Sequence, residues 1–429
     1  MRTLSSKIRT LFAIFILVLV AESCQSQWQS PLVGITENDT VGYSIFQEER
    51  NEIENIDHLK PFFQKMMRQR VFGGEQINIV HLGDSHILGN YLTAEVRQRL
   101  QRAFGDAGRG IIFPYKLVNS NGPQDYLVST TSRWSGTNCA RDLSEVKDYG
   151  ISGFTALNTQ ALGDLTFRLK DTTSGNTSTF TRVTVFYRNN ANAPEISLVD
   201  ETTQQKAKVV LEDNYSKTFF FDRPVAECTI KPATNTPGKK LWLDGISIDN
   251  ERSGVIYHSI GVNGAKFSDF ARSKHFARQL REVAPDLVVL SFGTNEAQAK
   301  HYPEQLERQM QDLCTQILQQ WPHTAILFTT PADSYLRGKG LNPYLPEVSE
   351  TIRQFARKKG FAIWDLFQIT GGANSSVTWK SLGLLSTDSV HYTKNGYKVQ
   401  GKILYQGLIK AYNEVAKTYL PSSSAEEGK

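Results

Sequence analysis

Apolar runs that alternate with amphipathic stretches occupy both ends of the 429-residue chain. An apolar run at residues 77–82 predicts a buried strand, and residues 90–104 then place apolar side chains at helical spacing. The alternation returns after residue 252. There it predicts strands at 286–291, 325–328 and 361–364, and helices at 266–283, 303–320, 345–359 and 395–415. Apolar strands alternating with helices indicate a parallel sheet that helices cover on both faces.

The middle of the chain has a different pattern. Residues 119–250 are rich in Asn, Thr, Ser and Gly and contain short runs of alternating polarity. These runs predict strands at 165–169, 183–187, 207–211, 217–221 and 241–243. Such a series indicates an all-β sandwich of the jelly-roll kind. We therefore predict an α/β domain formed by residues 25–118 and 251–420, with a β domain inserted into one of its surface connections.

The N-terminal segment, residues 1–24, predicts export. Basic residues precede an apolar run at 11–20, which is too short to span a bilayer and is typical of a secretory signal. The residues AESC at 21–24 resemble a bacterial lipobox, in which Cys24 is lipidated and anchors the protein to a membrane. Ala21 and Glu22 depart from that motif, so cleavage near Ser23 and a short membrane anchor are alternatives. All three predict a periplasmic or cell-surface protein.

Composition narrows the classes of function. A hydrophobic content of 40% and an aromatic content of 10% indicate a globular protein. The net charge of +5 is spread along the chain without a dense basic cluster, so we expect no nucleic-acid partner. In an exported protein Cys139 and Cys228 predict either a disulfide or two buried thiols. No Cys/His spacing suggests zinc, and the polar tail at 421–429 is predicted to be disordered.

Four short segments supply the groups of one hydrolase site. They are GDSH at 83–86, GVNG at 261–264, GTNE at 293–296 and DSVH at 388–391. Ser85 lies at a strand-to-helix turn, where helix amides favour negative charge, and His391 with Asp388 can act as a base and its orienting carboxylate. The N–H groups of Ser85 and Gly264 and the carboxamide of Asn295 predict an oxyanion hole. Each residue alone has an ordinary structural interpretation, such as a helix N-cap for the serine.

The order of these segments resembles the SGNH (GDSL-type) hydrolases. This resemblance covers residues 70–116 and 252–418 and implies a flavodoxin-like three-layer fold. The four marker residues of that superfamily correspond to Ser85, Gly264, Asn295 and His391, and Asp388 completes the triad. The family usually has Asp after the marker Asn, whereas this chain has Glu296.

A closer resemblance is to bacterial peptidoglycan O-acetylesterases. It is carried by the GDSH motif, by GRGIIFP at 108–114, by the β insertion, by GVNGA, and by Gly371-Gly372 before Trp379 and the DxxH pair. In that group the β domain is similar to a carbohydrate-binding module. His86 and Arg109 are candidate substrate contacts, with a structural histidine and a solvated arginine as the alternatives.

The sequence thus predicts an exported serine esterase that removes O-acetyl groups from a glycan polymer, with peptidoglycan as the preferred substrate. The mechanism requires no metal and no organic cofactor. Acetylated plant or exopolysaccharide glycans and simple lipid esters are alternative substrates. Two different functions also fit the sequence: a glycan-binding surface lipoprotein with an inactive hydrolase domain, and an acetyltransferase that runs the reverse reaction.

Overall fold

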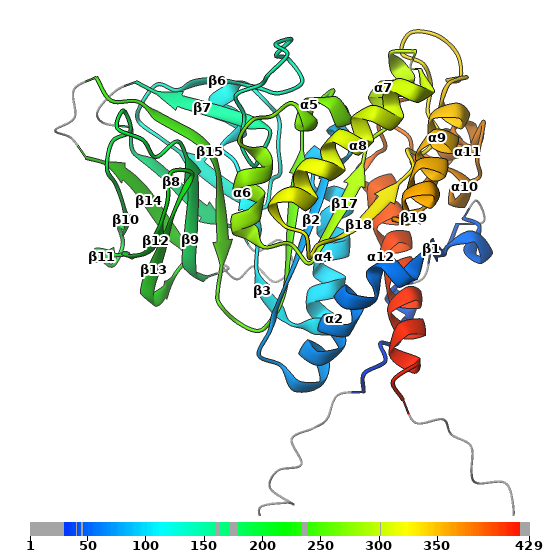
Figure 1. Ribbon diagram of the computed structural model, residues 1–429, viewed down its shortest axis with the longest axis horizontal. Helices are drawn as coiled ribbons and strands as arrows, with labels where there is room; N and C mark the ends of the chain where they lie inside the picture. The colour runs from blue at the N-terminus through cyan, green and yellow to red at the C-terminus, as the bar shows by residue number, and fades with distance from the viewer. Residues whose placement is uncertain are drawn as a thin grey trace, which may run out of the picture.

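The computed structural model describes residues 30–39, 41–43, 46–159, 163–170, 179–233, 238–300 and 302–420 (Figure 1). The predicted export signal with Cys24 and the predicted tail at 421–429 lie outside these residues. An α/β region and a β region lie side by side, with the β region at the left of the view. Within the described residues no helix is long and apolar enough to cross a membrane.

The α/β region is built on one seven-stranded sheet. Its strands are β1 (Ile53–Glu54), β2 (Gln76–Gly83), β3 (Asp106–Gly108), β16 (Gly254–Gly261), β17 (Leu287–Ser291), β18 (Ala325–Thr329) and β19 (Ala362–Trp364). They are arranged as β1-β19-β18-β17-β2-β16-β3, and every neighbouring pair is parallel except β1 with β19. The five strands from β16 to β19 follow the flavodoxin-like order, in which the direction of winding reverses between β2 and β17. The predicted fold class is confirmed.

Helices cover both faces of this sheet because its strands are apolar on both sides. In β2, Ile77 and Ile79 belong to one hydrophobic core and Val80 and Leu82 to the other. The first core contains α2 (Lys60–Phe72), α4 (Tyr91–Phe104) and α12 (Lys394–Lys417). The second contains α5 (Phe267–Ala271), α6 (Phe276–Val283), α8 (Pro303–Gln320) and α9 (Leu345–Lys359). Four short helices complete the region: α3 (Ser85–Leu88), α7 (Thr294–Gln298), α10 (Leu366–Ile369) and α11 (Ser375–Ser381).

One predicted helix is divided in two. The pattern predicts a single helix over 266–283, but the structure has α5 and α6 with a break between them. Lys147 of the β region pairs with Ser273 in an isolated bridge, and its backbone bonds to Arg272 and Lys274. These bonds take the backbone groups that a continuous helix would need. A tertiary contact therefore overrides the local helical pattern.

The β region consists of two antiparallel sheets. One has the order β11-β10-β14-β8-β5, and the other has the order β12-β13-β9-β15-β7-β6 with β4 paired to β15. The strands are β4 (Gly110–Ile112), β5 (Tyr126–Ser129), β6 (Ser135–Asn138), β7 (Phe154–Asn158), β8 (Leu165–Leu169), β9 (Phe180–Tyr187), β10 (Ile196–Asp200), β11 (Gln205–Lys206), β12 (Lys208–Glu212), β13 (Ser216–Val225), β14 (Glu227–Pro232) and β15 (Leu241–Asp249). Phe167 of one sheet stacks on Phe180 of the other at 5.8 Å between ring centres, so the two sheets form a sandwich.

The predicted disulfide between Cys139 and Cys228 is wrong, because both are free, buried thiols. Cys139 follows β6 in one sheet, whereas Cys228 lies on β14 in the other. The alternative interpretation, two buried thiols, describes them correctly. Burial raises the pKa of both thiols.

Candidate active site

Three residues from distant parts of the chain form a continuous hydrogen-bonded row. Ser85 begins α3 directly after β2, and its Oγ lies 2.8 Å from Nε2 of His391. Nδ1 of His391 lies 2.6 Å from Oδ2 of Asp388. With Nδ1 donating to the carboxylate, Nε2 is left to accept the proton of the serine hydroxyl, which is the arrangement of a Ser-His-Asp triad.

The loop that carries Asp388 and His391 is fixed by its own backbone. Oδ1 of Asp388 accepts hydrogen bonds from the backbone N–H groups of Val390 and His391, each at 3.0 Å. Ser389 has φ +59°, a left-handed conformation that costs a residue with a Cβ about 1 kcal/mol or more. Lys380 holds this strained residue by donating to its Oγ at 2.8 Å. Sequence reasoning missed Lys380 because nothing in its spacing links it to the DSVH segment.

Hydrogen bonds keep the Asp388 carboxylate ionised. Partial burial alone would raise its pKa, but the hydrogen bonds from the His391 ring and from the two backbone N–H groups outweigh burial, so the pKa lies below its usual value. The side chains of Asp388 and His391 are 47% and 28% exposed. The row therefore opens to solvent at its carboxylate end and can stabilise an imidazolium at neutral pH.

The backbone N–H groups of Ser85 and Gly264 can donate hydrogen bonds to an oxyanion. Ser85 is the first residue of α3, so its N–H has no acceptor within the helix. Gly264 follows β16 with φ +80°, and it lines the same cavity as Ser85 and His391. A positive φ favours glycine at this position. These donors lie at the carboxyl ends of β2 and β16, where parallel sheets bind ligands.

The third predicted donor, Asn295, lies in α7 at the end of β17 and lines the same cavity. Its Nδ2 donates to Oδ2 of Asp84 at 3.1 Å and to the carbonyl of Ala265 at 3.0 Å. Both amide hydrogens thus have internal acceptors, so an oxyanion has to share one of them. Burial raises the pKa of Asp84 to about 7, and protonation of Asp84 weakens its hold on Asn295.

Glu296, the departure from the family motif, is a buried structural residue. Its Oε1 accepts from the N–H of Phe267, and its Oε2 accepts from the N–H of Gly293, each at 3.0 Å. It thereby caps α7 and ties it to α5. Burial raises its pKa to about 7. The longer side chain keeps Asn295 in place without reaching the cavity.

His86, a predicted substrate contact, does not line the cavity that contains Ser85. It lines a separate, smaller cavity of about 40 Å³, and its Nδ1 lies 3.0 Å from the hydroxyl of Tyr397 on α12. Burial, together with the charge on nearby His391, lowers the pKa of His86 to about 3. Adjacent side chains on the turn diverge, so Ser85 faces the cavity while His86 packs behind it. The structural interpretation of His86 is the one that fits.

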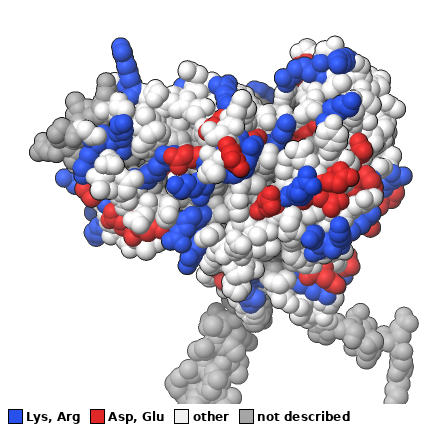
Figure 2. Space-filling model, turned by 45° about the horizontal axis from the view of Figure 1, so that its top comes forward, with Lys and Arg blue, Asp and Glu red and all other residues white. Residues whose placement is uncertain are grey.

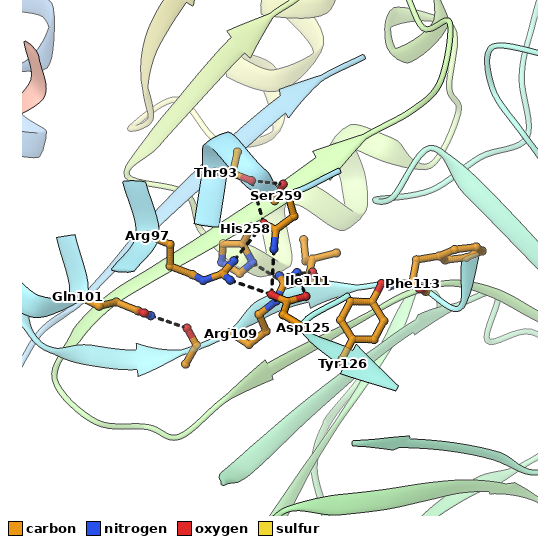
Figure 3. Close-up of polar contacts among 12 residues, drawn as sticks. Thr93, Arg97, Gln101, Arg109, Ile111, Phe113, Asp125, Tyr126, His258 and Ser259 are labelled. Atoms are coloured by element: carbon orange, nitrogen blue, oxygen red, sulfur yellow. Dashed lines mark hydrogen bonds and ion pairs between the residues drawn. The ribbon is translucent and has the colours of Figure 1, made fainter. Parts of the chain in front are cut away.

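Arg109, the other predicted contact, is buried and also lies outside this cavity. Its Nε forms an ion pair with Asp125 at 2.7 Å, and Arg97 of α4 pairs with the same carboxylate at 2.8 Å (Figure 3). Arg109 also donates to the carbonyl of Ile111 at 3.0 Å. Neither a substrate contact nor a solvated surface arginine describes it. A sequence pattern cannot show that Asp125, at the start of the β insertion, returns to this position.

Ser85, Gly264, Asn295 and His391 share one open cavity of about 740 Å³. Its further lining includes four basic side chains that the sequence analysis did not select, namely Arg141, Lys300, Arg337 and Lys339. The volume exceeds that of a single acetyl group, so the cavity can hold part of a larger molecule around the ester. The described residues contain no group of three or more His, Cys, Asp or Glu that could hold a metal ion.

Comparison with known proteins supports this chemistry. Residues 234–399 match the model of the GDSL-like Lipase/Acylhydrolase family. The match begins after Ser85, because the β insertion separates that residue from the rest of the hydrolase region. The match and the shared fold support an esterase or acylhydrolase, in agreement with the sequence prediction. A search of curated proteins finds no match.

Three solved structures are similar to this chain to different extents. A peptidoglycan O-acetylesterase superposes with a TM-score of 0.69 at 21% identity, covering 82% of this chain and 96% of the other. A lipase/acylhydrolase from Enterococcus faecalis gives a TM-score of 0.28 at 15% identity, with 37% and 77% of the two chains covered. A carbohydrate esterase of family 3 from Talaromyces cellulolyticus gives 0.29 at 16% identity, with 37% and 72% covered.

Proposed function

We propose that this protein is an exported serine esterase that removes O-acetyl groups from a glycan, with peptidoglycan as its substrate. The observation that carries the proposal is the continuous row from Ser85 through His391 to Asp388, which begins in a cavity beside the N–H of Gly264. A hydroxyl, a base, a carboxylate and oxyanion donors are the groups that acyl transfer needs.

In the proposed mechanism each residue has one role. Oγ of Ser85 attacks the acetyl carbonyl carbon while its proton passes to Nε2 of His391, and Asp388 stabilises the imidazolium. The N–H groups of Ser85 and Gly264 and the amide of Asn295 stabilise the oxyanion, each donor contributing about 3–4 kcal/mol. The bond to the sugar oxygen then breaks, and His391 returns the proton to that oxygen. Water, deprotonated by His391, attacks the acetyl-serine, which releases acetate and restores Ser85.

Three observations support the substrate. The similar peptidoglycan O-acetylesterase covers 82% of this chain, more than the α/β region alone, so the likeness extends into the β region. The cavity is larger than an acetyl group needs. The N-terminal sequence is typical of an export signal, and lipidation of Cys24 would keep the enzyme at a membrane facing the glycan. Peptidoglycan lies in that compartment.

The test is acetate release from O-acetylated peptidoglycan, acetylated xylan and 4-nitrophenyl acetate. We expect Ser85→Ala to lower kcat by about 10⁴-fold or more on every ester that the unaltered protein cleaves. Ser381→Ala, at an exposed serine that ends α11, is the matched control and keeps full activity. Normal turnover by Ser85→Ala contradicts the mechanism. Turnover of the small ester without any release from peptidoglycan keeps the mechanism and contradicts the substrate.

A further inference from the structure

The cavity around Ser85 carries positive charge without a neutralising carboxylate. Arg141, Lys300, Arg337 and Lys339 line it, and no Asp or Glu lies among its lining residues. All four side chains are exposed, and none forms an ion pair with another described residue. Four unpaired cations in one cavity repel one another, and an uncharged acetyl ester gives them no partner.

The four cations come from three separate elements. Arg141 follows β6 of the β region, Lys300 follows α7, and Arg337 and Lys339 lie in the loop after β18. Both regions of the molecule therefore contribute charge to the same cavity. Figure 2 shows Lys and Arg side chains on either side of the hollow between the two regions. A ligand that reaches from Ser85 toward either side meets positive potential.

The neighbouring cavity is different. It has a volume of about 670 Å³, shares Gly264 and Lys300 with the first, and is lined by acidic as well as basic side chains. Its acidic residues are Asp142, Asp269 and Asp312, and Asp269 forms a buried ion pair with Lys147 at 2.6 Å. The charge there is mostly compensated within the protein. Of these two cavities, the one that contains Ser85 is lined by cations without any carboxylate.

We infer that the substrate is an anionic glycan, whose carboxylates bind Arg141 on one side and Arg337 with Lys339 on the other while its acetyl ester lies at Ser85. This inference rests on the proposed esterase function and adds the charge of the substrate. Exposed guanidinium and ammonium groups attract carboxylates over a Debye length of about 8–10 Å and raise association rates at low salt. Peptidoglycan meets this requirement through the carboxylates of its peptide side chains, whereas neutral xylans do not.

The test compares charged and neutral acetylated substrates with charge-reversal variants. The substrates are O-acetylated peptidoglycan, O-acetylated alginate, acetylated xylan free of uronate, and 4-nitrophenyl acetate. The variants are Arg141→Glu, Arg337→Glu and their double combination. Lys206→Glu, an exposed lysine on the short edge strand β11, is the control for net charge.

We expect the double variant to lower kcat/KM on the anionic polymers by about tenfold or more at 50 mM salt. The loss shrinks toward 300 mM salt, because ions screen exposed charges. Turnover of xylan and of 4-nitrophenyl acetate changes less than twofold, and Lys206→Glu behaves like the unaltered protein.

Two results would overturn the inference. One is an equal loss on the neutral and the anionic substrates, since the cations would then act on the oxyanion or on released acetate. The other is an unchanged kcat/KM on both anionic polymers. Failure of the esterase proposal is a separate result, because the unaltered protein would then cleave none of the esters. Cleavage of acetylated alginate without cleavage of peptidoglycan supports the anionic substrate and contradicts only the choice of glycan.

Discussion

Two groups of basic side chains lie near the junction of the two regions. The charges of one group are neutralised by a carboxylate, and those of the other group are not. Arg97 and Arg109 are buried, with side chains 7% and 6% exposed, and both bind the carboxylate of Asp125. Arg141 and Arg337 are exposed and unpaired around Ser85. A buried charge without a partner is costly, so the first group needs its carboxylate to fold. Charge left unpaired at an exposed cavity remains available to a ligand.

The largest effect is expected from Asp125→Ala, which leaves two buried guanidinium groups without their carboxylate. We expect the free energy of unfolding, measured in urea titrations, to fall by about 3–5 kcal/mol. Removing one partner of a buried ion pair leaves the remaining charge buried without a counter-charge. Asp222→Ala is the control, since Asp222 pairs with Lys208 at the surface, where both side chains are more than half exposed. That change should cost less than about 1 kcal/mol. Equal costs for the two variants would break the comparison.

A pH series sharpens the same point. Burial alone would raise the pKa of Asp125, but the charges of Arg109 and Arg97 outweigh it and lower the pKa to about 2. Because the pKa is lower in the folded state, ionised Asp125 stabilises the fold above about pH 4, and this contribution disappears as the pH falls toward about 2. We expect the stability difference between the unaltered protein and Asp125→Asn to shrink by about 2 kcal/mol over that interval. A difference that stays constant from pH 5 to pH 2 contradicts this expectation.

Around Ser85 we expect stability to depend on backbone conformation rather than on charge. Gly264 has φ +80° with open space around it, so Gly264→Ala should cost about 1 kcal/mol of stability and lower kcat by displacing an oxyanion donor. Gly338→Ala is a matched control, because Gly338 has φ +70°, is also open, and lies between Arg337 and Lys339. Thermal unfolding should show similar losses for the two variants, whereas only Gly264→Ala should lower kcat on 4-nitrophenyl acetate. Unchanged kcat in Gly264→Ala argues against its N–H as a donor.

The smallest effect is expected from Arg141→Ala. Because its side chain has no ion pair among the described residues, the free energy of unfolding should change by no more than about 0.5 kcal/mol. The measurement is the same urea titration that is used for Asp125→Ala. A destabilisation above about 1 kcal/mol would mean that Arg141 has a structural role like that of Arg109.

The α/β elements were predictable because their patterns are long and local. The helices at 303–320 and 345–359 match α8 and α9 at both ends. In the β region the alternating runs located strands that overlap β8, β9, β12, β13 and β15, but other strands, such as β7 and β14, were missed. The pairing of the strands was not predicted, because it depends on partners far along the chain. Alternation within five residues specifies a face but not a neighbour.

The catalytic residues of the proposed site were predictable because reactive residue types occur at the ends of predicted strands and helices. Ser85, His391 and Asp388 were selected for their residue types at element ends, and the structure brings them within hydrogen-bond distance. Arg109 was selected because it lies in a conspicuous motif, but it is buried and paired with Asp125. Arg141, which lines the cavity, lies in a turn without a motif. Burial and ion pairing depend on the folded neighbours of a side chain, and local sequence does not contain them.

The position of β2 has a consequence for the synthesis of this protein. β2 is buried on both faces, and both strands that pair with it, β16 and β17, begin only at Gly254 and Leu287. A nascent chain therefore carries an apolar, unpaired strand throughout translation of the whole β region. Long-range parallel pairing of this kind forms slowly and leaves strand edges open to aggregation. Chains that terminate before Gly254 retain Ser85 but leave β2 unpaired, so premature termination yields aggregation-prone fragments rather than a smaller esterase.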